Sequence, residues 1–221
     1  MRDATRRNKN RAARRLAGQI LALTLTALFA SPALAHEATG LLGGFGSGFG
    51  HPLAGFDHFL AMLAVGLWGA QMGGRSIWTL PATFPLIMCI GGVLGMIDIG
   101  LGAQIETGIA LSLVVLGGAI AARWIAPEWA ALAIVAVFAF FHGYPHGQEA
   151  PRAVDPAAYT VGFVVSTGLI PILGIGVGFC LGRFLEGKIG RALGQVIAAC
   201  GVFLLVTRKD APWARLFAAQ P

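Results

Sequence analysis

Six apolar stretches follow one another along this chain, each close to the ~20 residues that an α-helix needs to cross a bilayer. They lie at about residues 52–72, 77–97, 105–124, 127–146, 158–182 and 188–207. The loops between them are short and leave no room for a soluble domain. Only 12% of the 221 residues are charged, against about 25% in soluble domains. The sequence therefore predicts an all-α polytopic membrane protein, folded as a six-helix transmembrane bundle.

Residues 1–35 have the pattern of a secretory signal peptide. A basic start is followed by an apolar run from about Leu16 to Phe29 and by Ala33-Leu34-Ala35, which matches an A-x-A cleavage site. Cleavage would leave one mature domain, residues 36–221, in a bacterial inner membrane with a periplasmic N-terminus. An uncleaved signal anchor is the alternative.

The positive charge of the chain belongs to this leader. Residues 1–15 hold seven basic residues against one acidic residue, which accounts for the whole formal net charge of +6. The remainder is formally neutral, so the charge does not indicate a nucleic-acid partner.

Four of the five histidines fall in two short segments at the ends of apolar stretches. The ionisable residues concerned are His51, Asp57 and His58 in HPLAGFDH, and His142, His146 and Glu149 in FHGYPHGQE. Such residues at a membrane boundary are costly to desolvate and usually mark a functional site. Imidazole and carboxylate together suit a borderline divalent metal such as nickel, cobalt, zinc or copper. The sequence therefore indicates a membrane protein that handles such a metal.

The expected topology places both segments on one side of the membrane. With an exported N-terminus, the first helix begins and the fourth helix ends at the periplasmic face, so we expect one shared metal site near that face. Pro145 should interrupt the backbone hydrogen-bond ladder within the second segment and free backbone carbonyls, because it cannot donate a hydrogen bond. Broken helix ends at a binding site are common in transporters. Asp98 and Glu106 flank a loop on the same side and could complete the site or serve only as loop and helix-start acids.

The basic residues support this orientation. The loops expected on the cytoplasmic side contain Arg75, Arg123, Arg183, Lys188 and Arg191, whereas the outer loops contain only Arg152. This satisfies the positive-inside rule. The basic C-terminal tail, on the outer side, is an exception.

Cleavage after Ala35 would make His36 the first mature residue. A free α-amine beside an imidazole can chelate a divalent metal, so His36 is a candidate for capturing ions. An ordinary cleavage junction without such a role is the alternative. The glycine-rich stretch from Gly40 to Gly50 is predicted to be too flexible for a stable helix and could act as a linker.

Glycines recur every four residues on three of the expected helices. The pairs and triplets are Gly91 and Gly95, Gly174, Gly178 and Gly182, and Gly190 and Gly194. Small residues at this spacing let helix backbones approach closely in lipid. The chain contains no G-x-x-x-x-G-K-[ST] segment, so it cannot be the ATPase of a pump.

At these residues the chain resembles the HupE/UreJ family of membrane proteins. The family pattern HPxxGxDHxxxMxxVG is met by His51, Pro52, Gly55, Asp57, His58, Met62, Val65 and Gly66. The pattern FHGxxHGxE is met by Phe141, His142, Gly143, His146, Gly147 and Glu149. The organisation as a signal followed by six helices is also similar, so the resemblance covers nearly the whole chain.

The resemblance implies a nickel permease associated with hydrogenase and urease gene clusters. Its implied partners are a divalent metal ion, nickel or else cobalt, and indirectly the maturation proteins of hydrogenase or urease. The wider nickel/cobalt transporters have H-x4-D-H where this chain has H-x5-D-H, so their coordination geometry does not transfer directly. The lipid bilayer is a further expected partner, and the sequence is compatible with a homo-oligomer.

Two other functions are open from the residues alone. Three histidines and an aspartate could hold a zinc ion with an open position for water, as in an intramembrane zinc-dependent hydrolase. Against an enzyme, Glu149 is the only other obvious acid or base. Paired histidines could also be axial ligands of haem in an electron carrier. We predict a transporter rather than an enzyme.

Overall fold

The computed structural model describes residues 41–148, 155–184 and 187–207, and these residues form seven α-helices. The helices are α2 (Leu41–Ala54), α3 (Phe56–Met72), α4 (Ser76–Met96), α5 (Gly102–Ala121), α6 (Glu128–Gln148), α7 (Pro156–Phe184) and α8 (Lys188–Thr207). Five are long and apolar enough to cross a membrane, and six spans result if α2 and α3 form one bent span. The chain is thus an all-helical, multi-pass membrane protein. The expected signal peptide lies outside the described residues.

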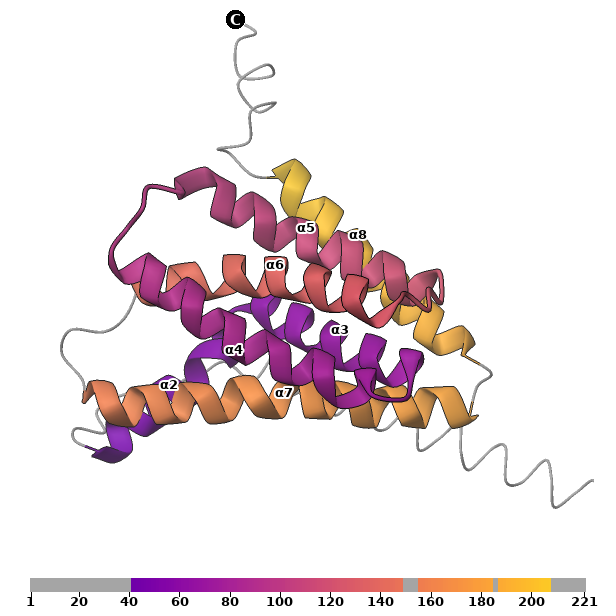
Figure 1. Cartoon of the computed structure of the whole chain (residues 1–221), viewed down its shortest axis with the longest axis horizontal. Coiled ribbons are helices and arrows are strands. Elements are labelled where there is room, and N and C mark those ends of the chain that lie inside the picture. The colour runs from indigo at the N-terminus through magenta and orange to yellow at the C-terminus, as the bar shows by residue number, and fades with distance from the viewer. Residues whose placement is uncertain (1–40, 149–154, 185–186, 208–221) are drawn as a thin grey trace, which may run out of the picture. The chain divides into compact units, whose positions relative to one another are not determined.

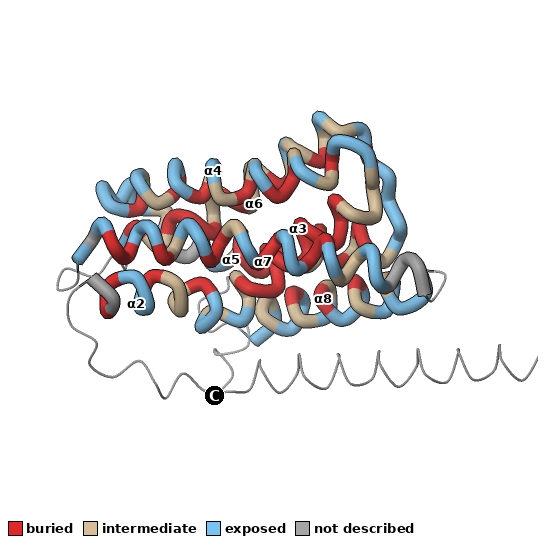
Figure 2. The backbone as a smooth tube through the Cα atoms, turned by 90° about the horizontal axis from the view of Figure 1, so that it is seen from below, coloured by how far each residue is buried: buried red, intermediate tan, exposed pale blue. Residues whose placement is uncertain are grey.

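Helix α3 lies in the middle of the helical bundle (Figure 1). It packs against α7, α4 and α5, and every residue from Phe59 to Gly69 is buried. A helix that is apolar all round can be buried on all sides in this way. Buried residues of the other helices gather on the sides that face the bundle interior, as Figure 2 shows.

Glycine contacts hold α4 and α6 together, backbone against backbone. A Cβ atom at Gly95 would collide with the carbonyl of Tyr144, and one at Gly143 with the carbonyl of Met88. The same close approach joins α5 to α8, where a Cβ at Gly194 would lie 2.6 Å from the Ala121 nitrogen. The packing role expected for the spaced glycines is confirmed at Gly91, Gly95, Gly174, Gly178 and Gly194. It is wrong at Gly190, whose Cβ would meet no described atom within 4 Å.

The glycine-rich stretch before the first motif is helical, contrary to our expectation. It forms α2, which packs along the first half of α7. Gly48 lies against the backbone of Tyr159, and Gly162 against that of Phe45. Close packing between the helices therefore outweighs the low helix propensity of glycine.

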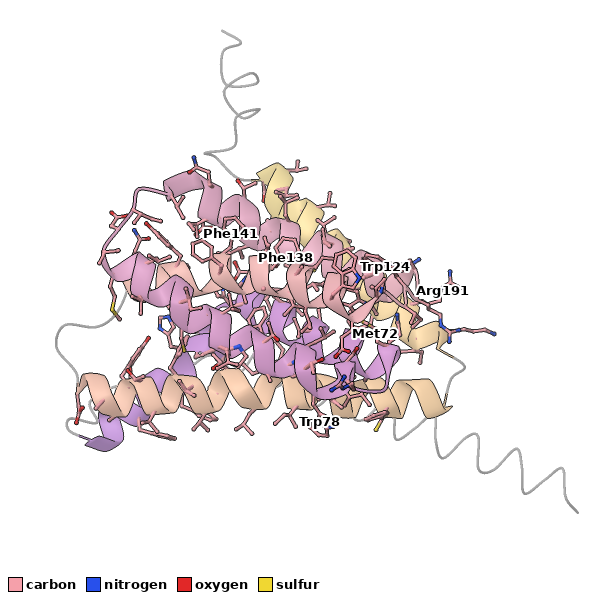
Figure 3. All side chains as sticks on the ribbon, in the orientation of Figure 1. Met72, Trp78, Trp124, Phe138, Phe141 and Arg191 are labelled. Atoms are coloured by element: carbon pink, nitrogen blue, oxygen red, sulfur yellow. The ribbon has the colours of Figure 1, made fainter. Side chains whose placement is uncertain are left out.

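The two ends of the bundle carry opposite charges. Every Lys and Arg in the described ranges lies at the end where α3, α5 and α7 finish: Arg75, Arg123, Arg183, Lys188 and Arg191. Figure 3 shows Met72, Trp124 and Arg191 gathered there, where Arg191 Nε donates a hydrogen bond to the Ala121 carbonyl at 3.2 Å. The acidic residues Asp98 and Asp155 lie at the opposite end, where α4 and α6 finish, whereas Glu128 begins α6 at the basic end.

Candidate metal centre

A break between α2 and α3 places the histidines of the first motif inside the bundle. The two helices are bent by 80° around Gly55, which has an extended backbone (φ −83°, ψ 100°). His51 lies in the last turn of α2 and His58 in the first turn of α3, so they flank the bend. We expected one helix to begin near residue 52, whereas Pro52 lies within α2.

Helix α6 supplies the other two histidines. His142 and His146 lie one turn apart, and the side chain of His142 has no exposed surface. The glycine contacts with α4 fix this part of α6, and Tyr144 adds a hydrogen bond from its hydroxyl to Asp98 Oδ1 at 2.8 Å. Helix α6 continues through Pro145 to Gln148, so the proline removes one backbone donor from the hydrogen-bond ladder without breaking the helix. The broken helix of the site is the α2–α3 pair instead.

The four histidine rings form a continuous series across the two motifs. The Nε2 atom of His51 lies 2.9 Å from Nδ1 of His146. The ring centroids of His146 and His58 are 4.8 Å apart, and those of His58 and His142 are 4.7 Å apart, both edge to face. The structure therefore brings together four side chains that are separated by up to 95 residues in the sequence.

Hydrogen bonds determine which ring nitrogen carries the hydrogen in two of these histidines. Asp57 Oδ1 accepts hydrogen bonds from the Nδ1 atom of His58 at 2.9 Å and from its backbone N–H at 2.8 Å. His142 Nδ1 donates to the carbonyl of Phe138 at 2.9 Å. Because a carboxylate and a carbonyl can only accept, Nδ1 carries the hydrogen in both rings. In the neutral rings, Nε2 then keeps a lone pair.

Three ring nitrogens of the cluster lack a partner. The Nε2 atoms of His58, His142 and His146 are buried without a hydrogen bond to any described residue. Leaving a buried polar atom unsatisfied costs about 1–3 kcal/mol, and such groups in folded proteins usually have a functional explanation. When His146 donates its Nδ1 hydrogen to His51 Nε2, all three Nε2 atoms carry lone pairs. Three such imidazole nitrogens in one buried cluster are a donor set that suits a borderline divalent metal.

The rings must move before they can surround an ion. Among the described residues, no group of three or more His, Cys, Asp or Glu side chains is arranged to hold a metal. Edge-to-face stacking directs the ring nitrogens past one another rather than to one point. Metal binding at this cluster therefore requires some of the rings to turn about their side-chain bonds.

Aromatic rings enclose the cluster. Phe84 of α4 lies 5.5 Å from the ring of His142, and Phe163 of α7 lies 4.7 Å from the ring of His146. Tyr159, one turn before Phe163, lies 5.9 Å from the ring of His51. These rings shield the histidines from lipid and lower the local polarity, which strengthens electrostatic interactions with a bound cation.

The expected site residues divide into three groups. The structure brings together His51, His58, His142 and His146, and Asp57 orients His58. Asp98 lies apart from the rings and accepts hydrogen bonds from Tyr144 and Gln148. His36 and Glu149 lie outside the described residues.

The sequence reasoning missed the contribution of α7. Tyr159 and Phe163 are four residues apart and thus share one helical face. That spacing is visible in the sequence, but it is equally typical of ordinary core packing, so it does not by itself indicate a site. The bend at Gly55 had a clearer signal, because Pro52 and Gly55 are turn-forming residues between two apolar runs.

Comparison with known proteins identifies relatives across most of the chain. A sequence model of a family described as HupE / UreJ protein matches residues 21–204. The protein named "Protein HupE" from Rhizobium leguminosarum bv. viciae is 40% identical over 188 residues, which cover 83% of this chain and 96% of that relative. No solved structure was found to match.

Proposed function

The chain belongs to the HupE/UreJ family, and we propose that it is a secondary permease for a divalent transition metal, with nickel as its cargo. The observation that carries this proposal is the buried histidine cluster, in which three Nε2 atoms have no partner among the described residues. A neutral, buried donor set can replace part of the hydration shell of an ion on its way through a bilayer. The resemblance to nickel permeases selects nickel from the metals that imidazole suits, which include cobalt, zinc and copper.

The cluster contains histidines held in a fixed orientation and one histidine contact that can break, and both suit transport. Asp57 and the Phe138 carbonyl hold the Nδ1–H groups of His58 and His142 and so present Nε2 as the ligand atom. The Nδ1 atom of His146 lies within hydrogen-bonding distance of His51 Nε2, a contact that can break when the ring turns its Nε2 atom towards a metal. Ligands that must turn to bind can also turn to release, which a permease needs and a permanent metal site does not.

We propose that the acidic end of the bundle faces the periplasm. All described Lys and Arg residues lie at the other end, which the positive-inside rule assigns to the cytoplasm. A bacterial inner-membrane protein with residues 1–35 as its signal peptide and a periplasmic mature N-terminus fits this orientation. His36 and Glu149 are then on the side from which the ion enters, and their role as metal ligands stays a prediction.

The cargo suggests the partners. A nickel permease of this family would supply hydrogenase or urease maturation indirectly, by raising the cytoplasmic nickel concentration. The lipid bilayer is its solvent, and a homo-oligomer stays a prediction. The proposal excludes an enzymatic role, and nothing in the comparisons supports the intramembrane zinc-dependent hydrolase that the residues left open.

Uptake of radiolabelled nickel into proteoliposomes tests the function. We expect the wild-type chain to accumulate nickel without ATP, and His58→Ala and His142→Ala to lose high-affinity uptake. Each substitution removes one of three unpartnered Nε2 atoms, and losing one ligand should weaken metal binding strongly.

Gln71→Ala is the matched control for these variants. Gln71 is a polar residue at the far end of α3, where its side chain donates to the Ala119 carbonyl at 3.5 Å. This variant should transport like the wild type. Undiminished uptake by both histidine variants, at equal protein incorporation, would contradict the proposed site.

A further inference from the structure

Helix α7 carries two adjacent buried hydroxyl groups in the middle of a membrane span. Ser166 and Thr167 are each only 1% exposed. Thr167 Oγ1 bonds to the carbonyls of Phe163 and Val164 at 2.9 and 3.1 Å, the usual arrangement for a hydroxyl within a helix. Ser166 is different, because its Oγ has no hydrogen-bond partner among the described residues.

Ser166 lies on the face of α7 that meets the histidines. Phe163 contacts the rings of His146 and His51, with centroid distances of 4.7 and 6.3 Å. Ser166 follows Phe163 by three residues, so both side chains project from the same helical face. The hydroxyl therefore lies one turn further along α7 from the aromatic ring that covers the cluster.

The packing of α3 on α7 sets the depth of Ser166. Gly174 lies against Gly66, and Gly178 lies against Ala70, so the two helices run in the same direction. His58 precedes Gly66 by about two helical turns, and Ser166 precedes Gly174 by the same length. Ser166 is thus level with His58.

Pro171 adds a second polar group to this stretch of α7. Proline has no N–H, so the carbonyl of Thr167 loses its normal intrahelical donor. Within a membrane, a freed backbone group is tolerated where it lines a protein interior or a polar cavity. The stretch of α7 that contains Ser166 therefore has one more oxygen acceptor without a helical donor than an uninterrupted helix would have.

We propose that Ser166 is a further cation-binding residue, whose hydroxyl oxygen contacts the divalent metal ion held by the histidines. This deepens the proposed function and rests on it. Ser166 Oγ and the Nε2 atoms of His58, His142 and His146 share one property, because each is buried without a hydrogen bond to a described residue. Once the rings have turned, one cation bound among them would satisfy all four groups. The site then draws ligands from α3, α6 and α7, with three imidazole nitrogens and one hydroxyl oxygen.

Calorimetric titration of the full-length protein with nickel chloride in detergent tests this proposal through Ser166→Ala. We expect the nickel Kd to rise about tenfold, in the range for groups that support a metal site. The thermal unfolding temperature without metal should stay equal or increase, because the change removes an unsatisfied buried hydroxyl. If the hydroxyl had only a structural role, Ser166→Ala would lower the unfolding temperature and leave the nickel Kd unchanged.

Ser112→Ala is the matched control. Ser112 is also fully buried in a span, but its hydroxyl donates to the Ile109 carbonyl at 2.6 Å. This variant should unfold at a lower or equal temperature and keep the wild-type Kd. Ser166→Thr, which keeps a hydroxyl, should bind nickel more tightly than Ser166→Ala.

Three results would overturn the inference. A wild-type Kd for Ser166→Ala, while the wild type itself binds nickel, removes the inference and leaves the permease proposal standing. Loss of cooperative unfolding in metal-free Ser166→Ala also removes it, because it assigns the hydroxyl a structural role. A wild-type protein that binds no nickel ends both proposals.

Discussion

Asp57 controls the orientation of His58, because one carboxylate oxygen holds both the ring Nδ1–H and the backbone N–H of its neighbour. Adjacent residues on a helix normally point apart. Here both residues lie in the first turn of α3, where the backbone N–H groups have no intrahelical acceptors. Asp57 therefore acts through His58 and need not touch the metal.

Asp57→Asn tests this role at the residue scale. The amide has nearly the same shape but no charge, so it holds the His58 ring less firmly and makes Nε2 a weaker ligand. We expect nickel affinity to fall roughly 10- to 100-fold, with little change in unfolding temperature. Calorimetric titration measures the affinity.

Asp98→Asn is the comparison for this variant. Asp98 is a carboxylate outside the ring cluster, bonded to Tyr144 and Gln148. Its replacement should leave nickel affinity within about twofold of the wild type, because it neither bonds to a histidine nor lies among the rings. An equal loss of affinity in both variants would mean that negative charge, rather than orientation of His58, controls binding.

At the scale of helices, the position of the histidines depends on the contact between α4 and α6. Gly143→Ala would place a Cβ atom against the backbone of Met88 and push the two helices apart. Overpacking of this kind costs roughly 1–3 kcal/mol. We expect a lower unfolding temperature together with weaker nickel binding, because His142 and His146 move with the helix.

Gly118→Ala provides the control, since its Cβ would meet no described atom within 4 Å. In an open position of a helix, alanine is as good as glycine or better. Thermal unfolding of both variants without metal separates the two effects. A Gly143→Ala protein as stable as Gly118→Ala would contradict the close contact of α4 with α6.

Local patterns predicted much of the site, and tertiary contacts account for the rest. Apolar runs and the spacing of His142 and His146 are local features, so the helical fold and one half of the cluster followed from the sequence. Helix α2 did not, because it depends on the contact of Gly48 with Tyr159, far away in the chain. The partnerless hydroxyl of Ser166 was equally invisible, since burial and hydrogen bonding are properties of the folded chain.

At the scale of the whole molecule, the close glycine contacts join particular helices into stiff units. Gly95 and Gly143 join α4 to α6, and Gly66 and Gly174 join α3 to α7. The side chains that we propose as metal ligands come from both units, with His58 and Ser166 in one and His142 and His146 in the other. We therefore expect any movement that carries an ion past the histidine cluster to be a sliding of the α3–α7 pair against the α4–α6 pair.

An ion bound in the cluster would therefore hold the α3–α7 pair and the α4–α6 pair together and oppose their relative movement. Nickel should slow amide hydrogen exchange in the first turns of α3 and the last turns of α6, relative to the metal-free protein. Exchange in α8, which lies against α5 on the far side, should hardly change. A uniform slowing of exchange in all helices would argue against a movement between the two helix pairs. The ion must leave before the two helix pairs can return to their starting positions. Tighter binding therefore slows the transport cycle, and an efficient permease binds its cargo only weakly.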